Sequence, residues 1–402
     1  MRRLPSLVLL LAVGAACAAA AGCGLPAAIG RGDAAVRRGA YDEADAAYVS
    51  AGARAPLDAW RGACHARLLA GKLAAALDAC ERALAANSAD AATLTLKGRA
   101  LRASARHDEA VRVLQAARAA GPDDRDAVAW LGMALVDDLR RGEALATLRA
   151  WVDLRPDNPV RWAELASLQA YVYDLDDAER SWRKVIDLDP AGAAAGYAGL
   201  AEAFLLHDQP HEARRAAETA LDRYSAQPYA GAVLARALAR EGEKALARSR
   251  LDASAPAASG AIFALLSRAE VGRLLGDAAM ARAALDAARA RDATDERIAY
   301  ERGLLLESLG PASAGDARAA YREALAIRPF YLEARWRLAL ATETSGDPTA
   351  YRDRLLEFLA QARDVAALRP WVDDALRRLP PDSGTPGSAP TPAAPESVPT
   401  PG

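Results

Sequence analysis

Residues 94–122 read LTLKGRALRASARHDEAVRVLQAARAAGP, and the pattern returns in residues 128–156, VAWLGMALVDDLRRGEALATLRAWVDLRP, and in residues 162–190, WAELASLQAYVYDLDDAERSWRKVIDLDP. The three segments are equally long, start at an equal spacing and end on a proline. At four further equivalent positions the three segments carry residues of one class: mostly bulky side chains at two positions and small side chains at the other two. The matched residues are Leu94, Val128 and Trp162; Gly98, Gly132 and Ala166; Ala110, Ala144 and Ala178; Leu114, Leu148 and Trp182; and Pro122, Pro156 and Pro190. Several residue classes that recur at one spacing indicate tandem copies of one structural unit.

Each copy predicts two helices joined by a turn, because its apolar residues recur at helical spacing and its proline ends the second helix. The small residues let the two helices approach closely, and larger side chains there would wedge them apart. The pattern resembles the tetratricopeptide repeat, a helical hairpin of about 34 residues. This resemblance implies an all-α fold, an α-solenoid in which about ten hairpins stack into a right-handed superhelix.

Weaker copies extend the pattern in both directions, so that about ten repeats account for the chain from Leu25 to Leu379. The order that we expect is a signal peptide over 1–22, an N-terminal repeat array over 23–242, a weak joint over 243–260, a C-terminal array with a capping helix over 261–379, and a tail over 380–402. The tail is rich in proline with Ser, Thr, Gly and Ala, and such a composition predicts a disordered segment.

The composition of the whole chain narrows the function. Hydrophobic residues make up 52% and aromatic residues 5% of the 402 residues, which favours closely packed helices over sheets. With 51 basic and 53 acidic residues the net charge is −2, so we expect no nucleic acid among the partners. No glycine loop, catalytic constellation or metal-ligand spacing is recognisable, so we expect no enzyme activity, no cofactor and no metal.

The N-terminus has the pattern of a secretory signal peptide, with two arginines before an apolar stretch and small residues after it. The sequence Ala20-Ala21-Gly22-Cys23 resembles the lipobox of bacterial lipoproteins, which implies lipidation of Cys23 and attachment to a membrane. Gly24 after the cysteine favours, by the rule for such lipoproteins, the outer membrane facing the periplasm. Ordinary cleavage after Ala18 to Ala20, giving a soluble periplasmic or secreted protein, and an uncleaved anchor are the alternatives.

Two further cysteines, Cys64 and Cys80, fall on the successive helices of one predicted hairpin, about one turn out of register. An oxidising compartment would allow them to form a disulfide. Small buried cysteines at a helix contact are the alternative, because reduced cysteine behaves as a small apolar residue.

The first helices of tetratricopeptide repeats line a concave groove that binds an extended peptide or a helix, so we map the inward places of this chain. Arg61, His65, Arg99 and Arg102 would form a basic patch suited to a carboxylate or an acidic segment. An apolar floor would continue the patch at Met133, Val136 and Tyr171. A solvated helix face of ordinary mixed charge is the plainer interpretation of each of these residues.

The function that we expect is a membrane-tethered adaptor of the bacterial cell envelope that binds protein partners. It would support assembly of a pilus, secretion or polysaccharide-export complex, by analogy with other envelope proteins of this class. The alternative is an accessory protein associated with glycan or peptidoglycan, in which aromatic residues such as Trp60, Trp162 and Trp336 stack on sugars.

Overall fold

The computed structural model describes residues 27–206, 208–225, 227–254 and 261–379. The predicted signal peptide, the lipidation site Cys23 and the predicted tail therefore lie outside the described residues. Every regular element in the described ranges is a helix. No helix among them is both long and apolar enough to cross a membrane.

The helices follow one another in pairs, and the two helices of each pair pack together as a hairpin. The ten pairs are residues 27–38 with α2 (Tyr41–Ala51), α3 (Pro56–Leu69) with α4 (Leu73–Ala86), α5 (Ala91–Ala103) with α6 (His107–Ala120), α7 (Arg125–Asp137) with α8 (Arg141–Asp153), α9 (Pro159–Tyr171) with α10 (Leu175–Leu188), α11 (Ala193–Leu206) with α12 (Pro210–Arg223), α13 (Pro228–Arg240) with α14 (Lys244–Ser254), α15 (Ile262–Leu275) with α16 (Ala278–Arg291), α17 (Glu296–Ser308) with α18 (Ala314–Ile327), and α19 (Leu332–Glu343) with α20 (Pro348–Ala362). Short 3-10 helices, η1 (Pro311–Ser313) and η2 (Ala366–Leu368), precede α18 and the final helix α21 (Arg369–Arg378). The predicted all-α array of hairpins is confirmed.

Local sequence explains where the central hairpins begin. Asp90, Asp124 and Asn158 precede α5, α7 and α9, and each side chain accepts hydrogen bonds from backbone N–H groups of the first turn. Such caps satisfy donors that have no partner inside the helix. The three caps recur at the same spacing as the prolines, so they belong to the same period.

The small residues have the packing role expected of them. A Cβ atom added to Gly98 would lie 2.4 Å from Leu114, and one added to Gly132 would lie 2.8 Å from Leu148. Neither distance is compatible with van der Waals contact, so the two leucines occupy the space that glycine leaves. Alternate small and bulky residues therefore set the spacing of the helices within the hairpin.

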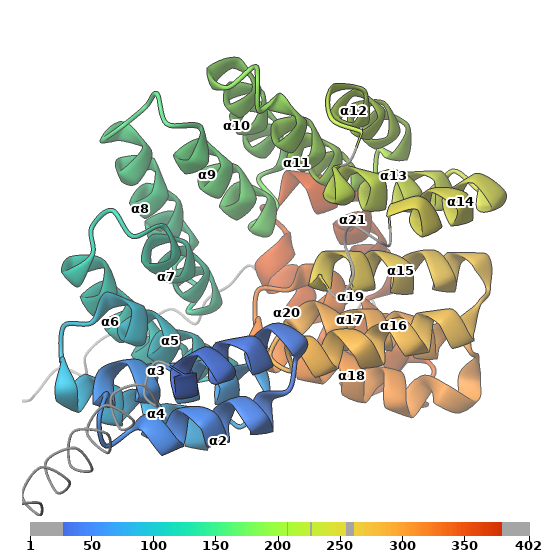
Figure 1. Cartoon of the computed structure of the whole chain (residues 1–402). Helices are drawn as coiled ribbons and strands as arrows, with labels where there is room; N and C mark the ends of the chain where they lie inside the picture. Colours follow the sequence, from blue (N-terminus) through green and yellow to red (C-terminus); the bar gives the residue numbers. More distant parts are fainter. Residues whose placement is uncertain (1–26, 207, 226, 255–260, 380–402) are drawn as a thin grey trace, which may run out of the picture.

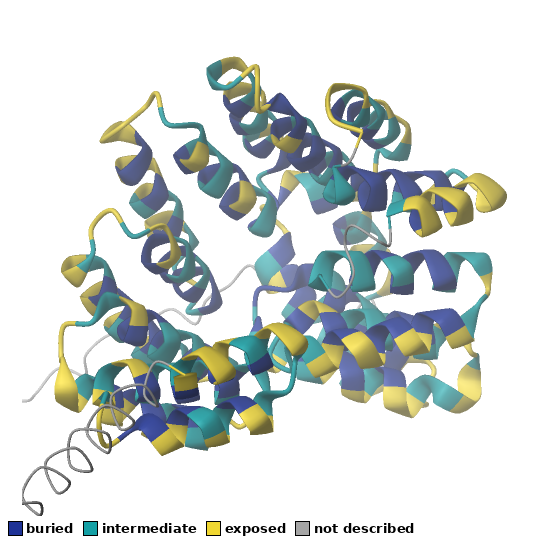
Figure 2. Ribbon diagram, viewed as in Figure 1, coloured by how far each residue is buried: buried dark blue, intermediate teal, exposed yellow. Residues whose placement is uncertain are grey.

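The row of hairpins does not stay open but curves round so that its last hairpins pack on earlier ones, and α18 packs against α5 (Figure 1). We call residues 27–188 the N-terminal arm and residues 193–379 the C-terminal arm. One apolar cluster contains buried residues of both arms, including Leu168, Tyr173, Phe330 and Trp336 (Figure 2). The sequence predicted a solenoid whose repeats contact only their neighbours, and the contact between arms departs from that expectation.

The last helix closes the stack as expected of a cap. Val372 and Ala375 of α21 are buried, while Trp371 and Leu379 pack on the same apolar cluster. The indole of Trp371 stacks on that of Trp336, with 6.3 Å between ring centroids. The apolar face of the last hairpin is thereby covered.

Candidate functional site

The first helices of the N-terminal arm form a pocket of about 450 Å³ on their inward side. The lining comes from the helix at residues 27–38 and from α2, α3, α5 and α7. It comprises Ile29, Asp33, Tyr48, Asp58, Arg61, Gly62, His65, Ala92, Thr95, Leu96, Arg99, Asp124, Asp126 and Trp130. Three of the predicted groove residues, Arg61, His65 and Arg99, therefore come together in one pocket.

The charge of this pocket is mixed rather than basic. Arg61 donates to Asp58 at 2.6 Å and to Asp90, its neighbour in the next cap, at 3.3 Å. Asp33 and Asp126 add two more carboxylates to the lining. Arg61 is thus engaged by the chain's own carboxylates, and the basic character that the sequence suggested rests on Arg99.

His65 does not add positive charge to the pocket near neutral pH. Burial and the neighbouring Arg99 guanidinium lower the pKa of the His65 imidazole from 6.5 to about 4, although Asp33 opposes that shift. A neutral imidazole offers one donor and one acceptor instead of a charge. His65 can therefore accept or donate a single hydrogen bond inside the pocket.

Arg99 is the least satisfied cation of the pocket. Its guanidinium lies 4.6 Å from the ring centroid of Trp130 and 4.0 Å from a carboxylate oxygen of Asp292, which belongs to the C-terminal arm. Its Nε is buried and has no hydrogen-bond partner among the described residues. Burial lowers the pKa of Arg99. A desolvated guanidinium with an unused donor favours an added carboxylate.

The rest of the predicted groove is closed. Arg102 is 5% exposed, donates to Asp137 and Tyr171, and lies 3.4 Å from Glu296 of the C-terminal arm. Burial alone would lower the pKa of Arg102, but the Asp137 and Glu296 carboxylates outweigh it and raise that pKa well above its ordinary value. Arg102 and the floor residue Tyr171 therefore lie inside a polar contact between the arms.

The floor residues themselves differ in their surroundings. Val136 is fully buried, Met133 is half-buried and is not among the residues that line the pocket, and the Tyr171 hydroxyl donates to Asp137 at 3.1 Å. The sequence placed these residues on the correct helices, because the period of the repeat fixes which side of each helix faces inward. It could not show that the other arm covers them.

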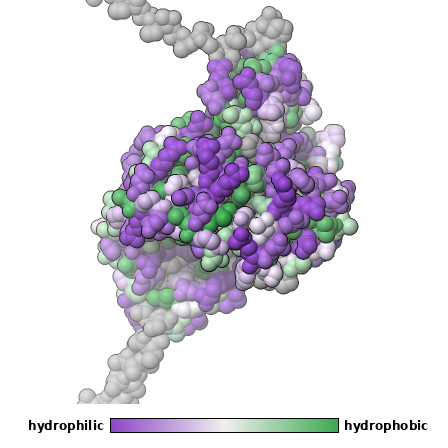
Figure 3. All heavy atoms as spheres, turned by 90° about the horizontal axis from the view of Figure 1, so that it is seen from above, coloured by the Kyte–Doolittle hydropathy of each residue, from purple (hydrophilic) through white to green (hydrophobic). Residues whose placement is uncertain are grey.

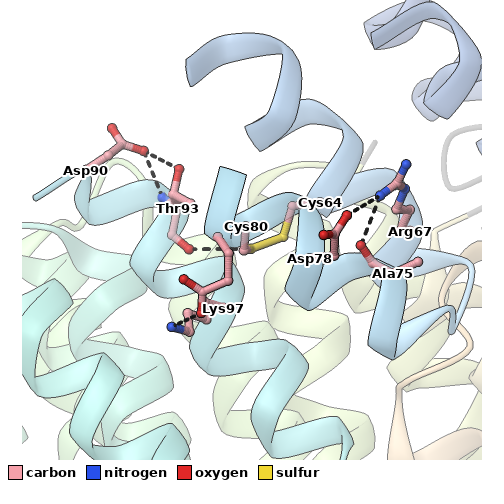
Figure 4. The surroundings of a disulfide bond; sticks show 9 residues. Cys64, Arg67, Ala75, Asp78, Cys80, Asp90, Thr93 and Lys97 are labelled. Atoms are coloured by element: carbon pink, nitrogen blue, oxygen red, sulfur yellow. Dashed lines mark hydrogen bonds and ion pairs between the residues drawn. A yellow bond between two sulfur atoms is a disulfide. The ribbon is translucent and has the colours of Figure 1, made fainter. Parts of the chain in front are cut away.

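Cys64 and Cys80 are joined in a disulfide that links α3 to α4 (Figure 4). The Cys80 sulfur also lies 3.8 Å from the carbonyl oxygen of Thr93, at the start of α5. The bond lies at the back of the hairpin that carries Arg61 and His65. It therefore fixes the hairpin from which these two pocket residues project.

The C-terminal arm satisfies its inward charges in a different way, which the sequence analysis missed. Arg236 of α13 donates to Glu202 of α11 at 2.5 Å and to Glu270 of α15 at 2.6 Å. Arg240 also donates to Glu270, at 2.8 Å. Glu202, Arg236 and Glu270 recur at the spacing of the repeat, so the alternation of charge at one place of the hairpin was the available signal.

The three tryptophans considered for stacking on sugars, Trp60, Trp162 and Trp336, each contact other residues of the chain. Trp336 is buried against Phe358, and the Trp162 indole donates to the Pro156 carbonyl at 2.8 Å. Trp60 is half-buried, with the Arg82 guanidinium 4.5 Å from its ring centroid. Seen from above, the surface is mainly hydrophilic with apolar residues in scattered groups (Figure 3). Within the described ranges, no group of three or more His, Cys, Asp and Glu side chains is placed to hold a metal ion.

Comparison with known proteins identifies the repeat. Residues 95–159 match the family model described as tetratricopeptide repeat. Residues 95–159 carry tetratricopeptide repeats. Proteins built from such repeats are scaffolds for protein–protein interaction, and the match includes most of α5 and all of α7, two helices that line the pocket.

The solved structures to which the chain is similar are distant in sequence. A chain of the APC/C hetero-tetramer Cut9–Hcn1 is 16% identical, with a TM-score of 0.44 over 87% of this chain and 75% of that chain. A tetratricopeptide repeat protein from Parabacteroides merdae is 14% identical, with a TM-score of 0.42 over 63% of this chain and 99% of that chain. No curated protein sequence matches the chain.

Proposed function

We propose that this tetratricopeptide-repeat scaffold binds an extended segment of a partner protein in the pocket between residues 27–38 and α7. The observation that carries the proposal is the state of Arg99, a half-buried side chain whose buried Nε has no hydrogen-bond partner among the described residues and whose ion pair with Asp292 is as long as 4.0 Å. A carboxylate side chain of the partner would satisfy that donor, while Trp130 and Ile29 offer apolar surface beside it.

The other charges of the pocket restrict which segment fits. Asp33, Asp58 and Asp126 line the same pocket as Arg99 and would repel a uniformly acidic peptide. They favour a segment in which a carboxylate is flanked by basic or polar residues. The expected partner motif is therefore of mixed charge, with its acidic residue directed at Arg99.

A photo-crosslinking experiment tests this pocket. Ala92 is exposed and lines the pocket, so a benzoylphenylalanine placed there contacts whatever binds. We expect crosslinked protein partners in native membranes, and Arg99→Gln should reduce their yield about tenfold by removing a charge-assisted contact. Arg112→Gln is the matched control, because Arg112 is exposed on α6, away from the pocket. Equal yields from Arg99→Gln and Arg112→Gln would refute the role of Arg99.

We further propose that the scaffold is tethered in the bacterial cell envelope by lipidation of Cys23, where it would assist assembly of a larger pilus, secretion or polysaccharide-export complex. The signal-like sequence of residues 1–22 supports export. The disulfide between Cys64 and Cys80 supports an oxidising compartment, because such bonds seldom persist in a reducing cytosol.

Membrane fractionation and intact mass of the natively expressed protein test the tether. We expect a membrane-bound form that begins with lipidated Cys23, and release of the protein by Cys23→Ala. A soluble, unlipidated product cleaved near Ala20 would remove the tether and leave a free periplasmic or secreted scaffold.

A further inference from the structure

The turn between α16 and α17, residues 291–296, reaches across to the N-terminal arm. Its backbone makes two of the contacts: the Ala293 N–H donates to the Leu69 carbonyl at 2.9 Å, and the Tyr41 hydroxyl donates to the Arg291 carbonyl. The Arg291 side chain in turn donates to the Arg37 carbonyl at 2.9 Å. These partners lie at the ends of the first helices of hairpins one and two and at the start of α2. The turn is therefore seated on the rim of the pocket.

Two glycines of the N-terminal arm make room for this turn. Gly71 has a φ of +73°, and a Cβ added there would lie 2.9 Å from the Ala293 side chain. Gly39 has a φ of +77°, and the Arg291 side chain lies 3.7 Å from the place of its missing Cβ. The left-handed conformation alone would favour glycine at both turns. At Gly71 the close approach of the opposite arm adds a second requirement.

The acidic side chains of the turn lie where the sequence predicted an acidic partner. Asp292 faces Arg99 at 4.0 Å, and Glu296 faces Arg102 at 3.4 Å. The turn reads Arg-Asp-Ala-Thr-Asp-Glu-Arg over residues 291–297, so its carboxylates are flanked by arginines. This is the mixed-charge pattern that the aspartates of the pocket favour in a partner segment.

The two ion pairs across the ring are not equally satisfied. Arg102 has two partners in its own arm, the Asp137 carboxylate and the Tyr171 hydroxyl at 2.7 Å, in addition to Glu296 of the other arm. Arg99 has only the distant Asp292 and the stacked Trp130. Because Arg99 also lines the pocket, one guanidinium serves both the turn and any ligand. A carboxylate brought closer to Arg99 would compete with Asp292.

A second contact holds the arms farther along and does not border the pocket. The Arg328 guanidinium donates to the Tyr171 carbonyl at 2.5 Å and lies 3.6 Å from the Tyr171 ring centroid. The Leu332 N–H donates to the Tyr173 hydroxyl at 2.9 Å, next to the apolar cluster shared by both arms. This contact combines apolar burial with polar bonds, whereas the turn at 291–296 is held by polar contacts. The turn is therefore the part that can detach while the ring stays joined.

From these contacts we infer that residues 291–296 are an internal ligand that competes with the partner segment for Arg99, so that partner binding and closure of the ring at this turn exclude each other. The inference rests on the proposed pocket. It makes the turn an autoinhibitory contact, with Asp292 as the group that a partner carboxylate displaces from Arg99 and Glu296 as a second charge that holds the turn through Arg102.

Hydrogen exchange of the full chain tests whether the charges hold the turn. In Asp292→Asn/Glu296→Gln we expect exchange of the amides at 290–297 to rise about tenfold, the effect of losing one charge-assisted contact. Asp316→Asn/Asp353→Asn is the matched control, because it removes the same number of charges from the same arm at two exposed positions away from residues 290–297. Unchanged exchange at 290–297 in the first variant would overturn the internal ligand.

A peptide binding measurement tests the competition. The probe is a fluorescein-labelled peptide of residues 289–298, RARDATDERI. We expect the peptide to bind Asp292→Asn/Glu296→Gln about tenfold more tightly than the unchanged protein. A peptide in which the residues corresponding to Asp292 and Glu296 are replaced by Asn and Gln should lose that gain. Equal binding to both proteins, or binding to neither, would overturn the competition. Partner crosslinking at Ala92 that still depended on Arg99 would then leave the proposed pocket intact.

Discussion

The two arms carry charged residues on the same inward side of the same kind of hairpin, but they satisfy these charges differently. In the C-terminal arm Glu202, Arg236 and Glu270 alternate in sign from one hairpin to the next, so that each charge finds its partner within the stack. In the N-terminal arm Arg99 and Arg102 carry the same sign on one helix, α5, and the hairpins on either side hold His65 and Met133, not a carboxylate, at the repeat spacing from Arg99. The remaining partners of the two arginines come from across the ring.

The pKa values reflect this difference. Burial alone would raise the pKa of the Glu270 carboxyl, but Arg236 and Arg240 outweigh it and lower that pKa to about 2. The pKa of Arg99 is lowered, because burial outweighs the distant Asp292. The repeat fold therefore does not decide whether the charged residues on an inward surface find their ion-pair partners within the same arm. The sign of the residue at one place in each successive hairpin decides it.

The largest expected effect comes from removing one arginine of each arm. Arg236→Met removes the arginine that pairs with Glu202 and leaves Glu270 with Arg240 alone, and Arg102→Met leaves the buried Asp137 with the Tyr171 hydroxyl but without its arginine. Each change should cost about 3–5 kcal/mol in the free energy of unfolding, because a buried charge loses its counterion. Urea unfolding followed by circular dichroism measures this cost.

The two variants should also differ in overall dimensions, and this difference tests whether Arg102 pairs between the arms and Arg236 within one arm. Small-angle scattering under native conditions should show a larger radius of gyration for Arg102→Met alone, since only Arg102 pairs across the ring. Arg180→Met, at an exposed pair, serves as the control for both. Equal expansion of both arginine variants would contradict the distinction between the arms.

The N-terminal arm should weaken in mild acid. The pKa of His65 is about 4 in the folded protein against 6.5 for an ordinary imidazole, so the unfolded chain binds the proton more readily. Stability should therefore fall as the pH drops from 6.5 towards 4, by about 3 kcal/mol at most. Denaturant midpoints measured at several pH values should be less sensitive to acid in His65→Gln. An unaltered acid dependence would show that His65 is not buried as described.

The C-terminal arm should respond in the opposite direction through Glu301. Burial and the nearby Glu270 carboxylate raise the pKa of the Glu301 carboxyl from 4.5 to about 7, and one of its oxygens has no hydrogen-bond partner among the described residues. The folded protein then binds the proton more readily, so stability should fall as the pH rises from 4.5 to 7, by about 3 kcal/mol at most.

The variant Glu301→Gln isolates this effect. It should be more stable than the unchanged protein at pH 8, where the carboxylate is charged, and should show little difference at pH 4.5. Thermal melts at both values are sufficient. Glu212→Gln, at an exposed position of α12, is the control.

The smallest expected effect concerns the turn inside each hairpin. The turn residue is a left-handed glycine at Gly39 and Gly71 in the N-terminal arm and at Gly242, Gly276 and Gly346 in the C-terminal arm, whereas Leu139 of the N-terminal arm adopts this conformation with a side chain, at a φ of +61°. Leu139 is 59% exposed, so Leu139→Gly loses little apolar burial and relieves this conformation, with an expected gain of about 1 kcal/mol. Leu154→Gly, at an exposed leucine with a φ of −67°, should instead destabilise. A loss of stability in Leu139→Gly would contradict the argument.

Much of the fold was accessible from the sequence because its signals are local and periodic. Gly98 and Gly132 predicted the close packing on Leu114 and Leu148, and the prolines marked the hairpin boundaries. The caps at Asp90 and Asp124 carried the same period and could have been read in the same way. Each of these signals lies within one or two repeats of the contact that it predicts.

The candidate site was only partly accessible, because half of it depends on contacts between distant repeats. Spacing placed Arg61, His65 and Arg99 on one inward face, and the structure brings them into one pocket. Nothing in the sequence near Arg102 or Tyr171 indicates that residues of the ninth and tenth hairpins cover them. Small curvature in each repeat, summed over the row, decides that contact, and such curvature leaves no local signature.

The meeting of α18 with α5 has a consequence for how this protein can change in length. An open solenoid tolerates the gain or loss of a hairpin, since each new unit only extends the row. Here a duplicated or deleted hairpin between the arms would carry the turn at 291–296 past Leu69 and Arg99, and every bond across the ring would lose its register. The number of hairpins is thus fixed by closure, and insertions should be tolerated at the outer loops instead of between repeats.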